Sequence, residues 1–405
     1  MKVLITSDLY KPSVNGVVTS ILNLKEGLEK RGHEVKILTL GDTLRSKETE
    51  EGYELGSISG GKIYQGVRIG GIHLFGEVSK AIEWGPDVVH TNCEFSTFIS
   101  ALRIAHELQI PLVHTYHTVY EDYTQYVLPG KMTGKTLVKE FTKIIARGTD
   151  GIIVPTPKIE QMLKDYGVKM QLFVVPTGVN LHKFSSIRNQ EFIRLKRQEL
   201  GIPEENRIMI SVGRVAPEKS LDKLIDTRHL MGNVPVTLLI VGGGPAEEDL
   251  HRQAEELRLL ENKKVVFTGM IDPEEVHSYY QLGDVFACAS TSETQGLTYY
   301  EAMACGLPLI CLRDECLDML VEEGENGYQC ESIEQLKDCL LDSLGQPEKL
   351  QQMGQKSAMK VQEFDNDLFC QRVEQIYLEL IRQNEKDGNT KMSIHSVLEK
   401  IHDKL

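Results

Sequence analysis

Long apolar runs are absent from this chain of 405 residues. A helix that crosses a bilayer needs about 20 consecutive, mostly apolar residues, and no stretch of the chain approaches that length. The apolar opening, residues 1–6, is too short for the core of a signal peptide. We therefore expect a cytoplasmic protein without a transmembrane segment.

Paired cysteines, positive net charge and a dinucleotide-binding fingerprint are also missing. The eight cysteines include no C-x-x-C pair and lie mostly in apolar runs, which predicts reduced core thiols and no metal site. The formal net charge of −14 argues against general nucleic-acid binding. Neither half of the chain opens with G-x-G-x-x-G and a downstream acid, so a hydride-transfer dehydrogenase is disfavoured.

What the chain does contain is two series of short apolar runs that alternate with helical patterns. Its length exceeds what one hydrophobic core usually serves, which predicts two domains. Alternating strands and helices predict doubly wound α/β domains with parallel sheets. We place the first domain at residues 1–180, the second at 181–379, and the linker between about 178 and 200. The expected strands are residues 3–6, 35–40, 87–91, 111–118, 152–156 and 172–179, then 207–212, 236–241, 265–271, 285–289 and 309–312.

Two glutamates eight residues apart, Glu293 and Glu301, mark the most informative stretch, residues 290–308. A buried strand at 285–289 leads through a turn at Gly296 into a helix, whose first unpaired amides can receive a diphosphate. Carboxylates suit sugar diols because their oxygens only accept hydrogen bonds. Glu293 can therefore contact a hexose and Glu301 a ribose. Two solvated surface glutamates are the alternative.

The loop after the strand at 207–212 carries two cations, Arg214 and Lys219. An arginine fork and a lysine point charge can together hold a diphosphate, although both could be surface charges. In the first domain, Gly16 precedes a helix, and a glycine lets a phosphate approach backbone amides; an ordinary turn explains it equally well. His117 follows a strand at the sheet edge where α/β domains bind ligands.

These motifs resemble those of a known enzyme family. The E-x7-E pair and the GRxxxEK loop resemble the retaining glycosyltransferases of family four. The segments KPSVNGVVTSILNLKEGLEKRGHEV, HTNCEF and HTYHTVYEDY look like the amino-terminal domain of bacterial diacylglycerol glucosyltransferases within that family. The resemblance implies a GT-B fold, in which two Rossmann-like domains face each other across a cleft and the last helix, here about 380–405, packs back on the first domain.

The resemblance also assigns roles to residues. It implies that Arg214 and Lys219 bind the donor diphosphate, that Glu293 contacts the transferred sugar, and that His117 lines the site near that sugar. Asp122 becomes a candidate contact for the acceptor hydroxyl. Further donor contacts would come from Gly16, from Gly269 and Met270 at the base, from the amides of Gly296, Leu297 and Thr298, and from Glu301 at the ribose. The family usually has a second glycine where this chain has Asn15, which leaves the role of that amide open.

The reaction implied is transfer of a hexose to diacylglycerol or a glycosyl-diacylglycerol with retention of configuration, and we expect the hexose to be glucose from UDP-glucose. No cofactor or metal is expected besides the nucleotide-sugar donor. A soluble or polymeric glycan acceptor, or another lipid such as ceramide, is the nearer alternative. A non-catalytic nucleotide-sugar binder is the farther one.

A cationic stripe accompanies these motifs. Five basic residues recur at every fourth position and fall on one side of a helix, opposite an apolar arc: Lys131, Lys135, Lys139, Lys143 and Arg147. Such a face can meet anionic lipid head groups, or it can simply be the solvated side of a surface helix. We expect the protein to be peripheral to the inner face of the cell membrane.

Overall fold

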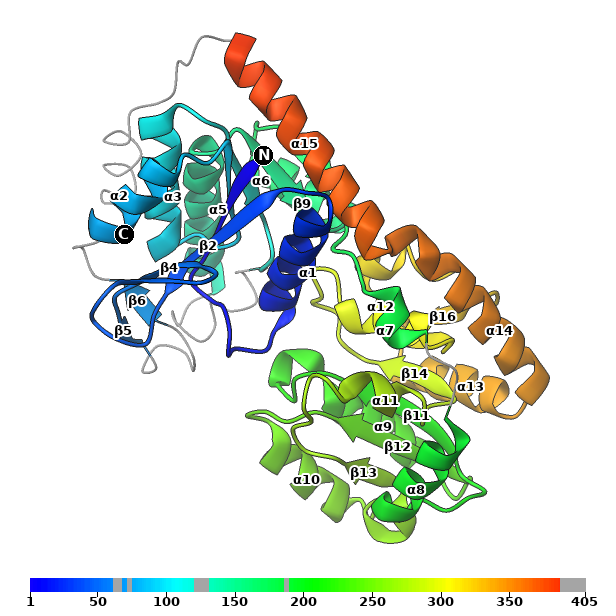
Figure 1. The fold of residues 1–405 in the computed structure, drawn as a ribbon. Coiled ribbons are helices and arrows are strands. Elements are labelled where there is room, and N and C mark those ends of the chain that lie inside the picture. Colours follow the sequence, from blue (N-terminus) through cyan, green and yellow to red (C-terminus); the bar gives the residue numbers. More distant parts are fainter. Residues whose placement is uncertain (61–67, 71–74, 120–130, 186–188, 387–405) are drawn as a thin grey trace. The chain divides into compact units, whose positions relative to one another are not determined.

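The computed structural model describes residues 1–60, 68–70, 75–119, 131–185 and 189–386. The chain divides into two compact units (Figure 1). Unit 1 combines Met1–Gly178 with Asn366–Leu405, and unit 2 is Val179–Asp365. The chain thus leaves unit 1 once and returns to it for its final helix.

Unit 1 is built on one sheet in the order β10-β9-β8-β7-β1-β2-β4-β3, in which every described neighbour pair is parallel except β3 and β4. Its strands are β1 (Lys2–Ser7), β2 (Glu34–Leu40), β3 (Lys47–Thr49), β4 (Gly52–Leu55), β7 (Val88–Thr91), β8 (Leu112–Thr115), β9 (Gly151–Val154) and β10 (Leu172–Val174); β5 (Ser57–Ser59) and β6 (Arg68–Gly70) form a separate hairpin.

Helices cover both faces of this sheet (Figure 1). Helices α1 (Gly16–Lys30) and α15 (Asn366–Lys386) share one core with β1 and β2. The other face carries α2 (Phe75–Trp84), α3 (Ser96–Leu108) and α5 (Lys131–Arg147), and α6 (Pro157–Tyr166) packs beside α5. The central strands are buried along their whole length because both faces are covered.

Unit 2 has a fully parallel sheet in the order β13-β12-β11-β14-β15-β16. Its strands are β11 (Arg207–Val212), β12 (Val236–Val241), β13 (Val265–Phe267), β14 (Val285–Cys288), β15 (Leu309–Leu312) and β16 (Gly327–Cys330). Its helices are α7 (Leu181–Phe184), α8 (Gln190–Leu200), α9 (Leu221–Leu230), α10 (Glu247–Glu256), α11 (Val276–Tyr280), α12 (Leu297–Ala304), α13 (Ile333–Leu344) and α14 (Pro347–Lys360). Both units are Rossmann-like, which confirms the α/β class expected from the sequence.

Several helix starts follow from their capping residues. The side chain of Asn15 accepts hydrogen bonds from the amides of Val17 and Val18 at the start of α1, and the side chain of Ser332 caps α13 in the same way. These bonds satisfy amides that have no partner inside the helix. Asn15, which stands where the family usually has glycine, therefore fixes the helix that begins at Gly16.

Some expected elements differ in the structure. Strands β8, β10 and β13 end earlier than their apolar runs suggest, since each run continues into a loop after the strand. Pro176 follows β10 and has no amide to donate, and Gly269 follows β13 with a left-handed φ of 69°. Helix α8 lies within the stretch at about 178–200 where we placed the linker, and β16 was not anticipated.

Candidate functional site

Two neighbouring strands of unit 2 carry the main candidate residues. Strand β11 pairs with β14, and the carboxyl ends of parallel neighbours lie at the same edge of a sheet. The loop after β11 holds Arg214 and Lys219, and the loop after β14 holds Glu293 and leads into α12. The sheet order therefore brings together loops that are separated by more than 70 residues along the chain.

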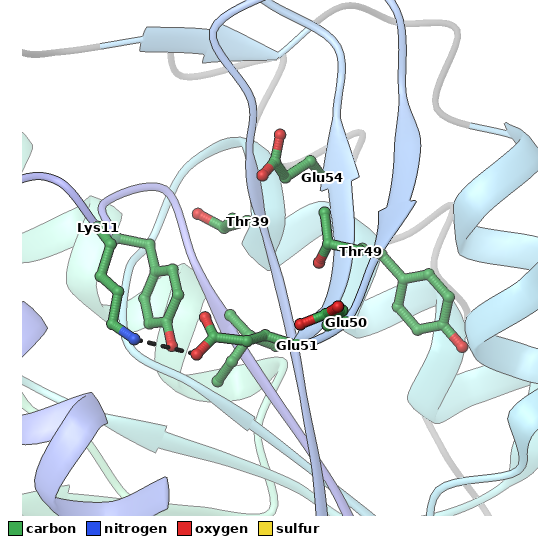
Figure 2. A pocket seen from close by; sticks show the side chains of 9 residues that line it. Lys11, Thr39, Thr49, Glu50, Glu51 and Glu54 are labelled. Atoms are coloured by element: carbon green, nitrogen blue, oxygen red, sulfur yellow. Dashed lines mark hydrogen bonds and ion pairs between the residues drawn. The ribbon is translucent and has the colours of Figure 1, made fainter.

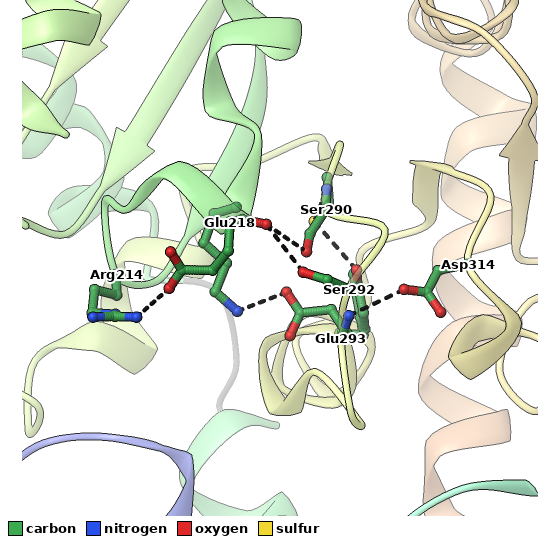
Figure 3. Close-up of polar contacts among 9 residues, drawn as sticks. Arg214, Glu218, Ser290, Ser292, Glu293 and Asp314 are labelled. Carbon is green, nitrogen blue, oxygen red and sulfur yellow. Dashed lines mark hydrogen bonds and ion pairs between the residues drawn. The ribbon is translucent and has the colours of Figure 1, made fainter. Parts of the chain in front are cut away.

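Lys219 and Glu293 contact each other directly. The Lys219 ammonium lies 2.7 Å from Glu293 Oε1, and the Glu293 residue is only 9% exposed. The hydroxyls of Ser290 and Ser292 each donate to the carbonyl oxygen of Glu218 at 3.3 Å, which joins the same two loops a second time (Figure 3). The predicted cation and the predicted sugar-binding carboxylate thus share one polar cluster.

A third loop positions the Glu293 backbone. Asp314, which is 4% exposed and follows β15, accepts a hydrogen bond from the Glu293 amide at 3.1 Å (Figure 3). Its other carboxylate oxygen accepts from the Cys316 amide at 2.9 Å. Sequence reasoning missed Asp314; its signal was a carboxylate just beyond a buried strand, at the edge where parallel strands place ligands.

Arg214 forms an ion pair within its own loop. Its guanidinium pairs with the Glu218 carboxylate four residues further along the same loop (Figure 3). We expected both cations of this loop to face the diphosphate. In the structure the Lys219 ammonium contacts the Glu293 carboxylate. To bind an anion, the Arg214 guanidinium would have to leave the Glu218 carboxylate or contact both groups at once.

The start of α12 is a turn that only glycine fits. Gly296 caps the helix with a left-handed φ of 73°, and a Cβ atom there would lie 2.4 Å from the Tyr299 ring. Glycine is therefore required both by backbone conformation and by space. The helix begins at Leu297, so the amides of Leu297 and Thr298 lie in its first turn, where α-helical amides lack intrahelical partners.

Glu301 lies one turn further along α12. Its Oε2 accepts a hydrogen bond from the Tyr280 hydroxyl at 2.7 Å. Burial raises the pKa of Glu301, and the Tyr280 bond and the charge of Lys183 act in the opposite direction. Tyr280, which the sequence analysis did not single out, fixes one oxygen of the Glu301 carboxylate.

Tight backbone contacts between loops surround the predicted base contacts. The Gly242 amide donates to the Gly269 carbonyl at 3.2 Å, and a Cβ at Gly242 would lie 2.0 Å from the Gly213 carbonyl oxygen. The loops after β11, β12 and β13 therefore pack backbone against backbone. Met270 follows with 76% of its surface exposed, so it is accessible to a ligand.

Gly16 and His117 lie in unit 1, whereas the other described donor-side candidates lie in unit 2. His117 follows β8, and its Nε2 lies 2.8 Å from Oδ1 of Asn92, which follows the neighbouring strand β7. Burial, with a smaller contribution from His114, lowers the pKa of His117 to about 3. The ring is therefore neutral at physiological pH, and donation from Nε2 to Asn92 leaves Nδ1 as a hydrogen-bond acceptor. Asn92 is a further residue that the sequence analysis missed.

The cationic stripe forms the predicted helix α5, Lys131–Arg147. Lys135 and Arg147 are exposed, Lys139 donates to the Asp165 carbonyl at 3.2 Å, and Lys143 pairs with Glu140 on the same helix. The side chain of Lys131, and Asp122 as a whole, lie outside the described residues.

Two observations on the described parts of the chain concern membrane spans and metal ligands. No helix there combines the length and the apolar character that crossing a membrane requires. The same parts hold no group of three or more histidine, cysteine, aspartate or glutamate side chains placed to ligate a metal ion.

Comparison with known proteins gives consistent matches over nearly the whole chain. Residues 14–183 match the model of "Glycosyltransferase Family 4" and residues 192–359 match "Glycosyl transferases group 1". The chain is 34% identical to the alpha-monoglucosyldiacylglycerol synthase of Streptococcus pneumoniae, covering 95% of this chain and 87% of that protein. It is 33% identical to the synthase of the same name from Acholeplasma laidlawii, covering 96% of this chain and 100% of that protein.

A solved structure has the same fold. HepE of Anabaena, in complex with UDP-glucose, superimposes with a TM-score of 0.73 at 17% sequence identity, covering 94% of this chain and 100% of that one. At this identity the match concerns the fold, which is GT-B.

Proposed function

Because this chain belongs to the family-four glycosyltransferases, together with the alpha-monoglucosyldiacylglycerol synthases, we propose that it transfers a hexose from a nucleotide sugar to diacylglycerol or a glycosyl-diacylglycerol. Glucose and UDP are the donor components that these relatives and the HepE complex favour. The proposal includes retention of configuration, independence from metal ions and action at the cytoplasmic membrane face.

The observation that carries the proposal is the 2.7 Å contact between Lys219 and Glu293. A cation for a departing phosphate and a carboxylate for sugar hydroxyls are needed within one sugar diameter of each other, and these two side chains meet that requirement. Asp314 fixes the Glu293 backbone, so the carboxylate is held in position before a ligand arrives. Pre-positioned charges of this kind stabilise a transition state without reorganisation.

In the proposed reaction, the bond between the anomeric carbon and the diphosphate oxygen breaks while a bond to the acceptor oxygen forms. Negative charge develops on the diphosphate as it leaves. Lys219, the amides of Leu297 and Thr298, and Arg214 after exchange from Glu218 would stabilise that charge. The acceptor hydroxyl would lose its proton to the leaving phosphate on the same face of the sugar, which gives retention.

Glu301 and His117 would bind hydroxyl groups. The Glu301 oxygen that Tyr280 does not occupy can accept from the ribose, and Tyr280 keeps the carboxylate oriented. Neutral His117, with Nε2 bonded to Asn92, presents Nδ1 to a hydroxyl of the transferred sugar. Gly16 at the start of α1, and Gly269 and Met270 after β13, complete the proposed donor contacts; Asp122 remains the proposed acceptor contact.

The membrane part of the proposal rests on α5 and its surroundings. Lys135 and Arg147 are exposed, and Leu137 on the same helix is 42% exposed. The ring of Phe95, itself 52% exposed, stacks on Phe141 of α5 at 5.7 Å between centroids. Exposed apolar side chains beside cations are typical of surfaces that bind the lipid interface.

A matrix of donors and acceptors tests the proposed function. Purified protein is incubated with each of UDP-glucose, UDP-galactose and GDP-mannose and with diacylglycerol, glucosyl-diacylglycerol, ceramide or a soluble glycan, and products are identified by mass spectrometry. We expect glycosylated diacylglycerol from a UDP-hexose, with the α-anomer seen by NMR and turnover unchanged by EDTA. Product from the soluble glycan alone would reject the lipid acceptor, and a β-anomer would reject retention.

A further inference from the structure

Unit 1 buries an acid and a histidine side by side, next to the strand that leads to His117. His114 lies in β8 and is 1% exposed, and Glu94 lies in the loop between β7 and α3 and is 6% exposed. The Nε2 atom of His114 is 3.2 Å from Oε1 of Glu94. Neither residue is among the donor or acceptor contacts named above, so the proposed transfer does not yet account for them.

An exposed ion pair of the same unit provides a contrast. Lys11 pairs with Glu51 at 3.0 Å in a hollow beside the β3–β4 hairpin, and the two side chains are 51% and 39% exposed (Figure 2). Water screens such a pair, which contributes little to stability. An uncompensated charge on either His114 or Glu94 would instead be buried, which is strongly unfavourable. The charge on one of these two groups is therefore tied to the charge on the other.

The surroundings of the His114 ring indicate where its protons are. Nδ1 lies 3.2 Å from the carbonyl oxygen of Thr91, which can only accept. Nε2 is buried, and its contact with Glu94 has the distance of an ion pair without the alignment of a hydrogen bond. A neutral imidazole carries one N–H, so one of its nitrogens would turn a lone pair towards an oxygen. A proton shared with Glu94 rests on the imidazole, which is the stronger base by about two pKa units.

The titratable groups that the structure places around this pair are His90, His117, Tyr116, Cys93 and Asp8. Burial lowers the pKa of both His90 and His117 to about 3, so these two rings are neutral. Burial raises the pKa of the Cys93 thiol, which is therefore uncharged as well. Asp8 is occupied elsewhere, since it accepts from the first amides of α3. Of the three histidines, His114 is thus the one that carries a charge, and Glu94 is its counter-ion.

Two contacts join the loop after β7 to the end of β8. Asn92 and Glu94 are two residues apart on that loop, and they contact His117 and His114, respectively. Thr91 and His114 are partners in the strand register, so the ion pair lies where the two strands part. Loss of the ion pair would loosen the loop that carries Asn92, and with it the orientation of the His117 ring.

We propose that Glu94 and His114 form a buried ion pair that positions Asn92 and His117 and keeps the His117 ring neutral by placing a positive charge close to it. Like charges close together disfavour each other, and His114 contributes to the lowered pKa of His117. Both residues act through His117 and Asn92, so they are positioning residues. Their effect on turnover rests on the proposed transfer reaction, whereas the ion pair itself does not.

Histidine NMR of the full chain tests the ion pair without an assay of activity. The chain is labelled with ¹⁵N-histidine, and the signals are assigned with His114→Gln and His117→Gln. We expect His114 to remain an imidazolium from about pH 6 to 8, beyond the ordinary pKa of about 6.5, and His117 to remain neutral with its proton on Nε2. Glu94→Gln keeps the size of the side chain and removes its charge. In that variant His114 should be neutral at about pH 7.5, and His117 should exchange between its two tautomers.

Initial rates test the positioning role. Glu94→Gln should lower kcat by up to about a hundredfold, the loss that a displaced reacting group can cause. Added to His117→Ala, it should cause no further loss, because residues that act through one another are not additive. Glu107→Gln is the matched control. It removes an ion-paired carboxylate from α3, but the pair with Arg103 is partly exposed, so activity should be unchanged.

The titration of wild-type His114 decides first. The proposal is overturned if His114 of the wild-type chain is neutral at about pH 7, or if Glu94→Gln leaves its protonation unchanged. It is also overturned if Glu94→Gln lowers turnover by the same factor with His117 present and with His117→Ala. If Glu94→Gln fails to fold, the wild-type titration still decides. Absence of any transferase activity in the wild-type chain would reject the proposed function and leave the NMR result valid.

Discussion

At the scale of single residues, Lys219 and Glu293 show how a site can be assembled before its ligand arrives. Each neutralises the other at 2.7 Å, so in the proposed reaction a nucleotide sugar would exchange this charge-assisted contact for others. The cost of separating buried or half-buried charges is thereby limited.

The first prediction concerns this pair. Lys219→Met and Glu293→Gln should each lower kcat about a hundredfold to a thousandfold, the usual loss for one preorganised group. The double variant should lose less than the product of the two, because residues in contact act as a unit. Initial rates with UDP-glucose measure both effects. Glu331→Gln, an exposed carboxylate of unit 2, should retain full activity, and additive losses would contradict joint action.

The second prediction concerns the protonation of His117. The pKa of His117 is about 3 in the folded protein, below the ordinary 6.5, so the ring of the folded protein stays neutral far below pH 6.5. The unfolded chain takes up the proton first, and the free energy of unfolding therefore decreases as pH falls from 6.5 towards 3. Wild-type turnover should accordingly show no decline due to His117 between about pH 5 and 8. Asn92→Asp places a carboxylate beside Nε2 and should raise the pKa of His117.

The pH dependence of turnover distinguishes the two forms of the site. In Asn92→Asp, activity should fall as pH is lowered through the raised pKa of His117, and imidazole NMR signals should titrate with the same midpoint. Asn92→Ala removes the acceptor without adding charge, so it should lower activity at all pH values and leave the shape of the profile unchanged. A wild-type shape in Asn92→Asp would refute the assigned contact.

At the scale of secondary-structure elements, the apolar runs predicted where most strands and helices lie but not where each strand ends. Strands β8, β10 and β13 stop short of their runs, because a strand continues only while a neighbouring strand offers hydrogen bonds. Helix α8 was not predicted. Its mostly polar sequence has no fully buried residue, and Phe192, Ile193 and Leu200 pack partly buried against the unit 2 core.

Helix α5 carries the third prediction. Replacing Lys135, Lys139 and Lys143 by glutamate should abolish binding to vesicles that contain anionic lipid, since each cation near such a surface contributes about 1 kcal/mol. Vesicle sedimentation measures the binding. The matched control replaces Lys349, Lys356 and Lys360 of α14 by glutamate, which changes the net charge equally. Equal losses in both variants would indicate a general charge effect, and retained binding in the α5 variant would reject this surface.

At the scale of the whole molecule, the chain makes unit 1 from two distant segments. Helix α15 contributes a row of buried side chains to the unit 1 core: Phe369, Cys370, Val373, Ile376, Tyr377 and Leu380. The Tyr377 hydroxyl also lies 2.6 Å from Nδ1 of His90, a buried residue of strand β7. Unit 1 therefore cannot complete its core from the first 178 residues.

The fourth prediction follows from this division. Residues 179–365 produced alone should unfold cooperatively, whereas a chain that ends at residue 365 should lack a cooperative transition for unit 1. Burial of one large apolar side chain contributes about 1.5–3 kcal/mol, so loss of several exceeds the usual stability of about 5–15 kcal/mol. Calorimetry and hydrogen exchange measure the outcome. Tyr377→Ala should destabilise unit 1 and exposed Arg372→Ala should not; a folded unit 1 without α15 would contradict the division.

The sequence by itself determined the α/β class, the order of most elements, the glycine turn at Gly296 and the candidate pair Glu293 and Glu301, because these depend on side-chain periodicity, backbone conformation and residue type within a few positions. Only the tertiary structure decided which groups meet. Lys219 and Glu293 are 74 residues apart, Tyr280 and Glu301 are 21 apart, and His90 and Tyr377 are 287 apart. Such contacts depend on the order of strands in the sheet and on how loops pack at its edge. Both are determined by packing between residues that are far apart in the chain.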